Sequence, residues 1–226
     1  MYVPAHYQGS PAAAVTLVRA SPLATLLSSA DPVPYATHLP VVIPEATADA
    51  LRSGPVDLSG HRLAGHMNRT NPHWRHICEG ETPALLVFRG PNGYVSPEVY
   101  DYSPAAPTWN FTAVHVRGTL RPLPAGEATR TVIRRTVQEL EGRFGFGWDM
   151  TDSLEYFDRI ISGVGAFEVE VEKVDGMFKL SQEQSDGVRS KVTRHFSECP
   201  HTGYRDLAHA MEQFGKVDNQ NLGEAL

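Results

Sequence analysis

The stretch AFEVEVEKV, residues 166–174, alternates apolar and acidic side chains along its length. Its apolar positions are Phe167, Val169 and Val171, and its acidic positions are Glu168, Glu170 and Glu172. A period of two is typical of a strand with one buried and one solvated face. The stretch NFTAVHVRGTL, residues 110–120, alternates in the same way. Both segments are therefore predicted to be strands.

The remaining elements follow from turn signals and helix caps. Further strands are predicted at residues 23–29, 35–43, 61–67 and 83–90, the last ending at a GPNG turn. Helices are predicted after Ser10 and Asn71, each followed by a proline, and near residues 126–143, 151–162, 184–197 and 203–215. Residues 46–60 are expected to form an irregular connection, and the tail to Leu226 is expected to fray. About six antiparallel strands with peripheral helices predict an α+β barrel.

Composition excludes several classes of protein. The net charge is 20 − 26 = −6, which argues against a nucleic-acid binder. The N-terminal residues lack the pattern of a signal peptide, and no stretch approaches the roughly 18 apolar residues of a membrane span. A cytoplasmic protein without membrane partners is expected. Cys78 and Cys199 make no disulfide framework and no zinc pattern, so both are expected to be ordinary thiols.

Residues 63–80, LAGHMNRTNPHWRHICEG, contain three histidines. The predicted helix start at Asn71 would direct free backbone N–H groups at an anion, together with Arg69. His73 and His76 would share a helix face, and we interpret them as surface or capping histidines. His66, on the preceding strand, is equally compatible with a hydrogen-bonded, half-buried histidine and with a ligand. Glu79 and Glu81 are a poor match to a zinc site.

Three other stretches carry candidate residues. Trp109 and His115 fall on one face of the strand at 110–120, His38 lies in YATHLP, and Lys179 lies in FKLSQEQ. Each is also explained by core packing or by ordinary hydrogen bonding. The sequence contains no readable nucleophile–base pair, no glycine-rich phosphate loop and no paired carboxylates.

Six blocks occur in the order and spacing of the PaiB-like family: MYVPAHY, ATHLP, GHMNRTNPHW, GPNGYVSPEVY, PTWNFTAVHVRG and GVGAFEVEVEKVDGMFKLSQ. The resemblance covers residues 1–182 and implies a split β-barrel domain, with a helical insertion near 126–162. Residues 183–226 would then be a C-terminal helical extension. The family also implies a homodimer with the cofactor at its interface, and its ordinary members resemble FMN-binding transcriptional regulators.

The chain departs from those members where a phosphate would bind. They typically continue KLSQN with a basic residue, whereas Glu183 and Gln184 follow Gln182 here, and His73 stands where glutamine is common. An acid in place of a donor weakens a phosphate site. The opening block, GHMNR and KLSQEQ are more similar to a heme-dependent branch of the family, the piperazate synthases. That branch closes the N–N bond of piperazic acid from δ-N-hydroxyornithine.

The resemblance to this branch implies a heme b cofactor and a small amino-acid substrate. We expect His66 to be the axial metal ligand, with His38 and His115 as rivals. The other cofactor-binding residues are expected to be Asn71, Trp109, His115 and Lys179. Arg69, with Arg89 behind it, is expected to bind the substrate carboxylate as a catalytic residue. The alternatives are an FMN-binding PaiB-like regulator without catalytic activity, with FMN as the cofactor, and a heme or flavin oxidoreductase on the same barrel.

Overall fold

A computed structural model describes residues 1–214 of the chain. Within that range the chain forms six β-strands and seven α-helices, with four short 3-10 helices between them. The strands are β1 (Leu23–Ser28), β2 (Tyr35–Val42), β3 (Arg62–Asn68), β4 (Thr82–Val95), β5 (Thr108–Pro122) and β6 (Val164–Lys179). The helices are α1 (Pro11–Ala20), α2 (Glu45–Ser53), α3 (Pro72–Ile77), α4 (Glu127–Phe144), α5 (Leu154–Ile160), α6 (Asp186–Glu198) and α7 (Tyr204–Phe214).

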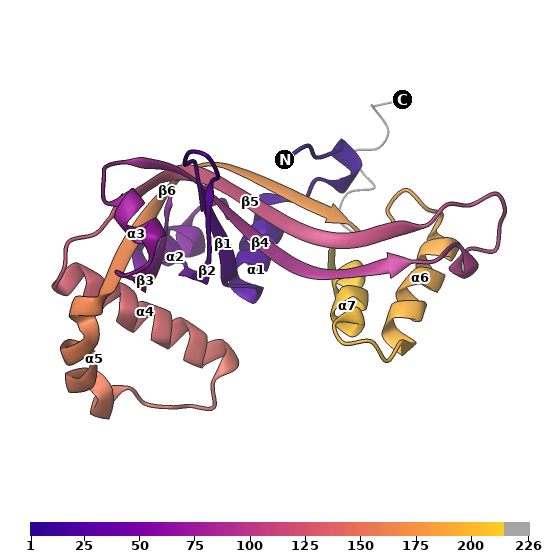
Figure 1. Cartoon of the computed structure of the whole chain (residues 1–226). Coiled ribbons are helices and arrows are strands. Elements are labelled where there is room, and N and C mark those ends of the chain that lie inside the picture. The colour runs from indigo at the N-terminus through magenta and orange to yellow at the C-terminus, as the bar shows by residue number, and fades with distance from the viewer. Residues whose placement is uncertain (215–226) are drawn as a thin grey trace. The chain divides into compact units, whose positions relative to one another are not determined.

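The six strands form a closed barrel in the order β1-β2-β3-β6-β5-β4 (Figure 1). Each pair with a resolved register is antiparallel, and β3 pairs with β6 so that Gly65 faces Phe167 and His66 faces Ala166. The predicted α+β barrel is therefore confirmed. The expected fraying of the tail concerns residues 215–226, which lie outside the described range.

The alternation in β6 divides it into a buried and a solvated face. Phe167 and Val169 are completely buried, and Val171 is 2% exposed. On the other face Glu168 pairs with Arg62 at 3.0 Å, and Glu170 pairs with Arg121 at 2.6 Å. Exposed pairs of this kind contribute little to stability, so the apolar face holds the strand in the barrel.

The chain divides into two compact units. The barrel unit comprises Val18–Phe88 and His115–Val174. The terminal unit comprises Met1–Leu17, Arg89–Val114 and the described chain from Asp175 onward. The long strands β4, β5 and β6 contribute residues to both units. The expected boundary between residues 182 and 183 lies inside the terminal unit.

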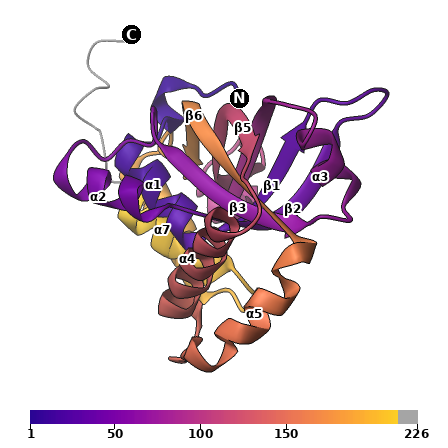
Figure 2. The same ribbon diagram turned by 90° about the vertical axis from the view of Figure 1, so that its left-hand side faces the viewer.

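In the barrel unit, α4 packs against β2 and β3 (Figure 2). A small apolar cluster joins Ala64 of β3, Ala166 of β6 and Val132 of α4, with Leu123 against it. Helix α4 thus covers the outward face of β3, on which Ala64 and His66 lie two residues apart. The insertion is helical, as predicted.

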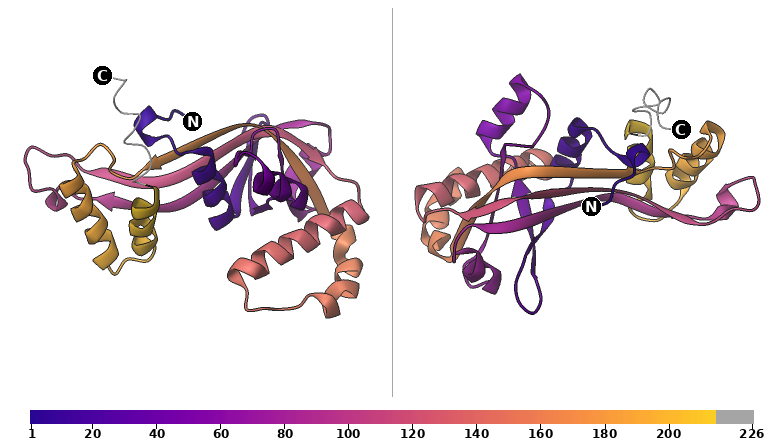
Figure 3. Two further views of the ribbon diagram at one scale, coloured as in Figure 1. Left: turned by 180° about the vertical axis from the view of Figure 1, so that it is seen from behind. Right: turned by 90° about the horizontal axis from the view of Figure 1, so that it is seen from above.

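In the terminal unit, α6 and α7 lie side by side (Figure 3). Their side chains close on β4 at Gly93, where an added methyl group would lie 2.8 Å from Phe196 and 2.9 Å from Leu207. The Tyr204 hydroxyl of α7 accepts a hydrogen bond from the Tyr94 backbone N–H at 3.4 Å. The two C-terminal helices predicted from the sequence are confirmed.

Two predictions about local structure are wrong. Residues 46–60 are not an irregular connection, because α2 begins at Glu45 and buries Thr47, Ala48 and Leu51. The strand predicted at 83–90 does not end at GPNG, since β4 continues to Val95. Gly93 serves close packing against α6 and α7 rather than a turn. No helix among the described residues is long and apolar enough to cross a membrane.

Candidate functional site

The corner between β3 and α3 carries most of the predicted site residues of the barrel unit. After β3 the Asn68 side chain accepts hydrogen bonds from the backbone N–H and the hydroxyl of Thr70, both at 2.8 Å, which turns the chain. Asn71 then caps α3, accepting from the backbone N–H of His73 at 3.0 Å, with Pro72 as the first helical residue. The predicted helix start is confirmed.

The Asn71 side chain makes two hydrogen bonds in this corner. Besides capping α3, its Nδ2 donates to Thr37 Oγ1 at 3.3 Å. Its amide therefore ties α3 to β2.

His66 lies on the outward face of β3, opposite Ala166 of β6. The ring is half-buried, and its Nδ1 atom is buried without a hydrogen-bond partner among the described residues. Burial lowers the pKa of His66 below its ordinary value. The imidazole is therefore neutral at neutral pH, which is the form that binds a metal.

Arg69 is held at the same corner by contacts with β6 and α3. Its Nε donates to the Val164 carbonyl at 2.9 Å, and its backbone N–H donates to the Gly163 carbonyl at 2.9 Å. The guanidinium carbon lies 5.5 Å from the centre of the Trp74 ring. Trp74 also packs against the backbone of Gly165, where an added methyl group would lie 2.4 Å from the indole.

His73 is buried rather than exposed, so its interpretation as a surface or capping residue is wrong. Its Nε2 lies 2.9 Å from Ser28 Oγ and its Nδ1 lies 2.9 Å from Thr37 Oγ1, while its ring stacks on Tyr35. Burial, with the nearby His76 as a second cause, lowers the pKa of His73 to about 4. With both nitrogens bonded, His73 is a neutral structural residue.

His76 shares its helix face with His73, as predicted, since the centre of its ring also lies 5.2 Å from that of Tyr35. Its Nδ1 is 3.8 Å from Glu79, and its Nε2 is buried without a partner in the described chain. It lines a pocket of about 250 Å³ with Glu79, Glu81 and neighbouring residues. Among residues 1–214 no group of three or more histidine, cysteine or acidic side chains could hold a metal ion.

The two rival histidines differ from His66 in their surroundings. His38 is exposed on β2, and its Nδ1 lies 3.0 Å from Thr25 Oγ1. His115 is half-buried on β5 between the buried Val114 and Val116, and it too has an interaction partner. His66 is thus the one of these three candidates whose buried ring nitrogen is unpaired within the described residues.

The other predicted residues belong to the terminal unit. Arg89 is exposed on β4. Trp109 is 50% exposed, so it is not part of an aromatic core, and its Nε1 donates to Asn92 Oδ1 at 3.2 Å. The Lys179 ammonium lies 2.5 Å from Thr108 Oγ1 and 5.7 Å from the centre of the Tyr7 ring. The predicted set therefore divides between the units, with His66, Arg69, Asn71 and His115 in the barrel unit.

One group of side chains in the terminal unit was not predicted from the sequence. Burial, with the nearby Glu183 carboxylate as a further cause, raises the pKa of Tyr7 above its ordinary value. Tyr100 lies near enough for Glu183 to raise its pKa as well, although burial is the larger cause. The sequence offered two separate signals, Tyr7 in the opening block and the acid after KLSQ, but nothing that linked residues 176 positions apart.

Comparisons with known proteins are consistent with this barrel. The chain is 26% identical over 216 residues to "Protease synthase and sporulation protein PAI 2" of Bacillus subtilis, covering 94% of this chain and 97% of that protein. It is 25% identical over 238 residues to an uncharacterized protein of Emericella nidulans, covering 90% and 93%. The solved structure of the "FAD and Heme binding protein" of Mycobacterium smegmatis shares the fold at a TM-score of 0.53 and 16% identity, over 80% of this chain and 78% of that one.

A family model described as "Putative FMN-binding domain" matches residues 1–173. That segment includes β1 to β5 and the first part of β6. It holds every predicted site residue except Lys179. The PaiB-like resemblance seen in the sequence is confirmed at the level of the family. Because the match covers most of the 226 residues, the chain belongs to this FMN-binding domain family.

Proposed function

We propose that the protein is a heme-dependent piperazate synthase, which cyclises δ-N-hydroxy-L-ornithine with loss of water. The observation that carries the proposal is His66, a neutral histidine on β3 with a buried ring nitrogen that no described residue satisfies. An unpaired buried polar atom is costly, so it suggests a partner outside the protein chain. The name of the Mycobacterium smegmatis protein indicates that this fold is compatible with heme.

The residues around His66 fit the role of an axial heme ligand. A neutral imidazole is a common ligand of heme iron, and the lowered pKa of His66 keeps protons from competing for it at neutral pH. Ala64 and Ala166, the small neighbours of His66 on the same face, pack with Val132 of α4. Bound heme would supply a Lewis acid that makes the hydroxylamine oxygen a better leaving group.

The chain itself would bind and orient the amino acid. Arg69 follows His66 by three residues and carries a positive charge, so it remains the proposed partner of the substrate carboxylate. Its contacts with Val164 and Trp74 fix the guanidinium in one place, and this lowers the entropy lost on binding. Arg89, which is exposed, is the second proposed cation.

The test compares wild type with His66→Ala and, as a matched control, with His38→Ala, which removes an exposed histidine. Wild type and the control should purify with a sharp heme absorption band, and His66→Ala should lose it. Anaerobic incubation with δ-N-hydroxy-L-ornithine, without nicotinamide, should yield piperazic acid by chiral chromatography. Heme-loaded wild type that makes no piperazic acid would contradict the proposed synthase activity. A His66→Ala variant that purifies with full heme would contradict the assignment of His66 as the heme ligand.

The second candidate is an FMN-binding PaiB-like regulator without catalytic activity. The family match over residues 1–173 favours it. Such a protein should purify with the broad two-band spectrum of a flavin and should consume no hydroxyornithine under any condition. Glu183 counts against it, because a carboxylate beside a phosphate raises the electrostatic cost of binding.

We also propose that the protein is a homodimer, since barrels of this kind leave apolar strand faces that a symmetric partner covers. Sedimentation equilibrium at micromolar concentration should give twice the chain mass of 24.8 kDa. A species at the chain mass would contradict the dimer.

A further inference from the structure

A pocket of about 250 Å³ lies in the barrel unit, where α3 ends and β4 begins. It is lined by Ser29, His76 and residues 79–83, all of which belong to that unit. The volume is below the roughly 300–1,000 Å³ that is typical of pockets for drug-sized ligands, so it fits a small molecule and not a heme or a flavin. The proposed roles of His66 and Arg69 do not account for it.

The ring of His76, in the wall of this pocket, makes no hydrogen bond among the described residues. Its Nε2 is buried without a partner, and its Nδ1 lies 3.8 Å from Glu79, which is too far for a hydrogen bond. His73, one turn earlier on α3, has each ring nitrogen 2.9 Å from a hydroxyl group. The fold therefore satisfies the ring of His73 and leaves that of His76 unpaired.

The burial of Nε2 determines where the ring of His76 carries its proton. A proton on Nε2, in the neutral ring or in the imidazolium, would be a buried N–H group without an acceptor, which is rare in folded proteins. The remaining form is the neutral ring with its proton on Nδ1. His76 therefore presents an N–H donor on the side of Glu79, and the 3.8 Å between the two groups leaves that donor unpaired.

The charged groups of the pocket favour a cation. Glu79 and Glu81 line it, and among residues 1–214 no lysine or arginine lines it or forms an ion pair with Glu79. Glu81 pairs with Arg121 at 2.7 Å, but Arg121 also pairs with Glu170 at 2.6 Å, so one guanidinium faces two carboxylates. The potential in the pocket is therefore negative, and it attracts a positively charged ligand.

We propose that this pocket binds a small protonated amine with a neighbouring hydrogen-bond acceptor, as in an amino alcohol. The ammonium group pairs with Glu79 in a charge-assisted hydrogen bond, and the acceptor receives the Nδ1–H of His76. The short distance between Nδ1 and the carboxylate, 3.8 Å, requires that the two groups lie close together in the ligand. The site uses none of the residues proposed to hold heme or hydroxyornithine, so its test does not depend on the proposed function.

The experiment is an NMR titration of the isotope-labelled full chain, in which the backbone amide signals of Gly80 and Thr82 report on the pocket. Three probes of similar size separate the two contacts. Ethanolamine carries both the amine and the acceptor, propylamine lacks the acceptor, and ethylene glycol lacks the charge. The pH and the ionic strength are held constant throughout.

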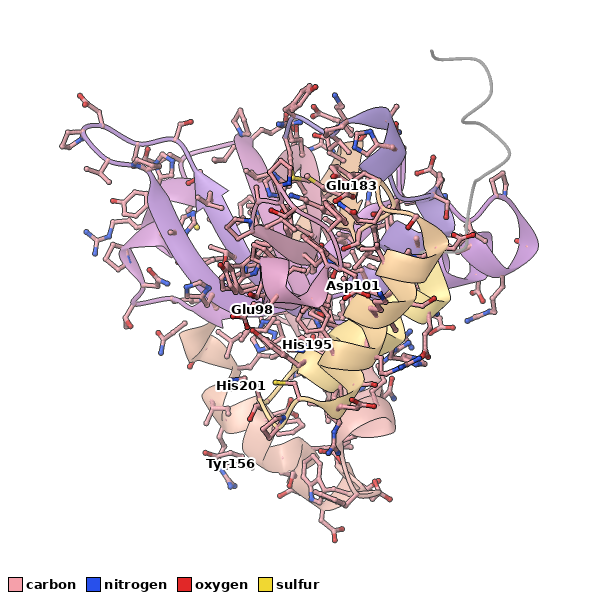
Figure 4. The ribbon with its side chains drawn as sticks, turned by 90° about the vertical axis from the view of Figure 1, so that its right-hand side faces the viewer. Glu98, Asp101, Tyr156, Glu183, His195 and His201 are labelled. Carbon is pink, nitrogen blue, oxygen red and sulfur yellow. The ribbon has the colours of Figure 1, made fainter. Side chains whose placement is uncertain are left out.

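Two variants remove one contact each. Glu79→Gln removes the charge and keeps the shape, and His76→Phe keeps a planar ring and removes both nitrogens. Glu98→Gln is the matched control, because it removes an exposed glutamate of the terminal unit that does not line the pocket (Figure 4). Circular dichroism and the melting temperature should show that the variants fold as wild type does.

Ethanolamine should give saturable shifts in wild type and should bind about fivefold or more tightly than propylamine and ethylene glycol do. Glu79→Gln should weaken its binding about fivefold, which corresponds to about 1 kcal/mol, the upper range for an exposed ion pair. His76→Phe should remove the preference for ethanolamine over propylamine, and Glu98→Gln should leave each affinity within about twofold of wild type. The absence of saturable shifts in wild type, equal affinities for the three probes, or unchanged ethanolamine affinity in Glu79→Gln would overturn the proposal.

Discussion

The buried His73 should make the protein less stable in weak acid. Its folded pKa of about 4 lies below the ordinary value of 6.5, so the unfolded chain binds a proton more readily than the folded chain in this pH range. The stability that His73 contributes is fully present above its unfolded pKa and is lost as the pH falls toward its folded pKa. Integration gives a loss of about 2 kcal/mol between about pH 7 and 5, and of about 3 kcal/mol by about pH 4.

His73→Gln isolates this contribution, because glutamine can still reach Ser28 or Thr37 but cannot be protonated in this range. The variant should lose about 1–3 kcal/mol at pH 7 through the weakened hydrogen bonds. Its free energy of unfolding should, however, fall by about 2 kcal/mol less than that of wild type between about pH 7 and 5. Urea unfolding at both pH values measures this difference directly.

The matched control is His38→Gln, which removes an exposed histidine from β2 and should keep the pH dependence of wild type. His66, whose pKa is also lowered, is present in all three proteins and therefore cancels in the comparison. Equal pH dependence in His73→Gln and wild type would refute the reasoning. So would an NMR titration of His73 with a midpoint near its ordinary pKa.

Substitutions at three further positions test the packing and the helix cap. Gly118→Ala should destabilise the barrel by about 3 kcal/mol or more in urea unfolding, because the added methyl group would lie 2.0 Å from the Glu170 carbonyl oxygen. A loss below about 1 kcal/mol would show that the two backbones separate easily. Gly142→Ala, in an open position of α4, should instead raise the melting temperature through a gain of about 0.5–1 kcal/mol, and a decrease would contradict the open environment. Asn71→Ala should cost about 1–2 kcal/mol, and Asn71→Asp, which keeps the acceptor, should recover most of it.

Local patterns were sufficient for most elements of the fold. Alternation over 110–120 and 166–174 identified β5 and β6, and the Asn71–Pro72 pair identified the start of α3. Helix α2 was missed because its nine residues lie between prolines and glycines that are typical of a connection. The end of β4 was misplaced because GPNG is a common turn sequence, whereas here Gly93 makes room for α6 and α7.

The candidate site was less accessible from the sequence because its contacts are long-range. The two hydroxyls that bind His73 are 45 and 36 residues away, so no local pattern distinguishes this histidine from an exposed one. The unpaired nitrogen of His66 depends on burial that only the folded chain creates. Spacing directed attention to the corner between β3 and α3, but it could not separate the structural His73 from the unpaired His66.

The contact of Trp74 with the bare backbone of Gly165 and with the Arg69 guanidinium gives the protein an intrinsic optical probe. Trp74 is 6% exposed, whereas Trp109 and Trp148 are each 50% exposed and complete the set of three tryptophans. The emission of Trp74 should therefore be shifted to shorter wavelength and be shielded from acrylamide, while the other two are quenched. Fluorescence that survives quencher then reports on the corner beside His66, and an acceptor chromophore bound there would extinguish it without any label.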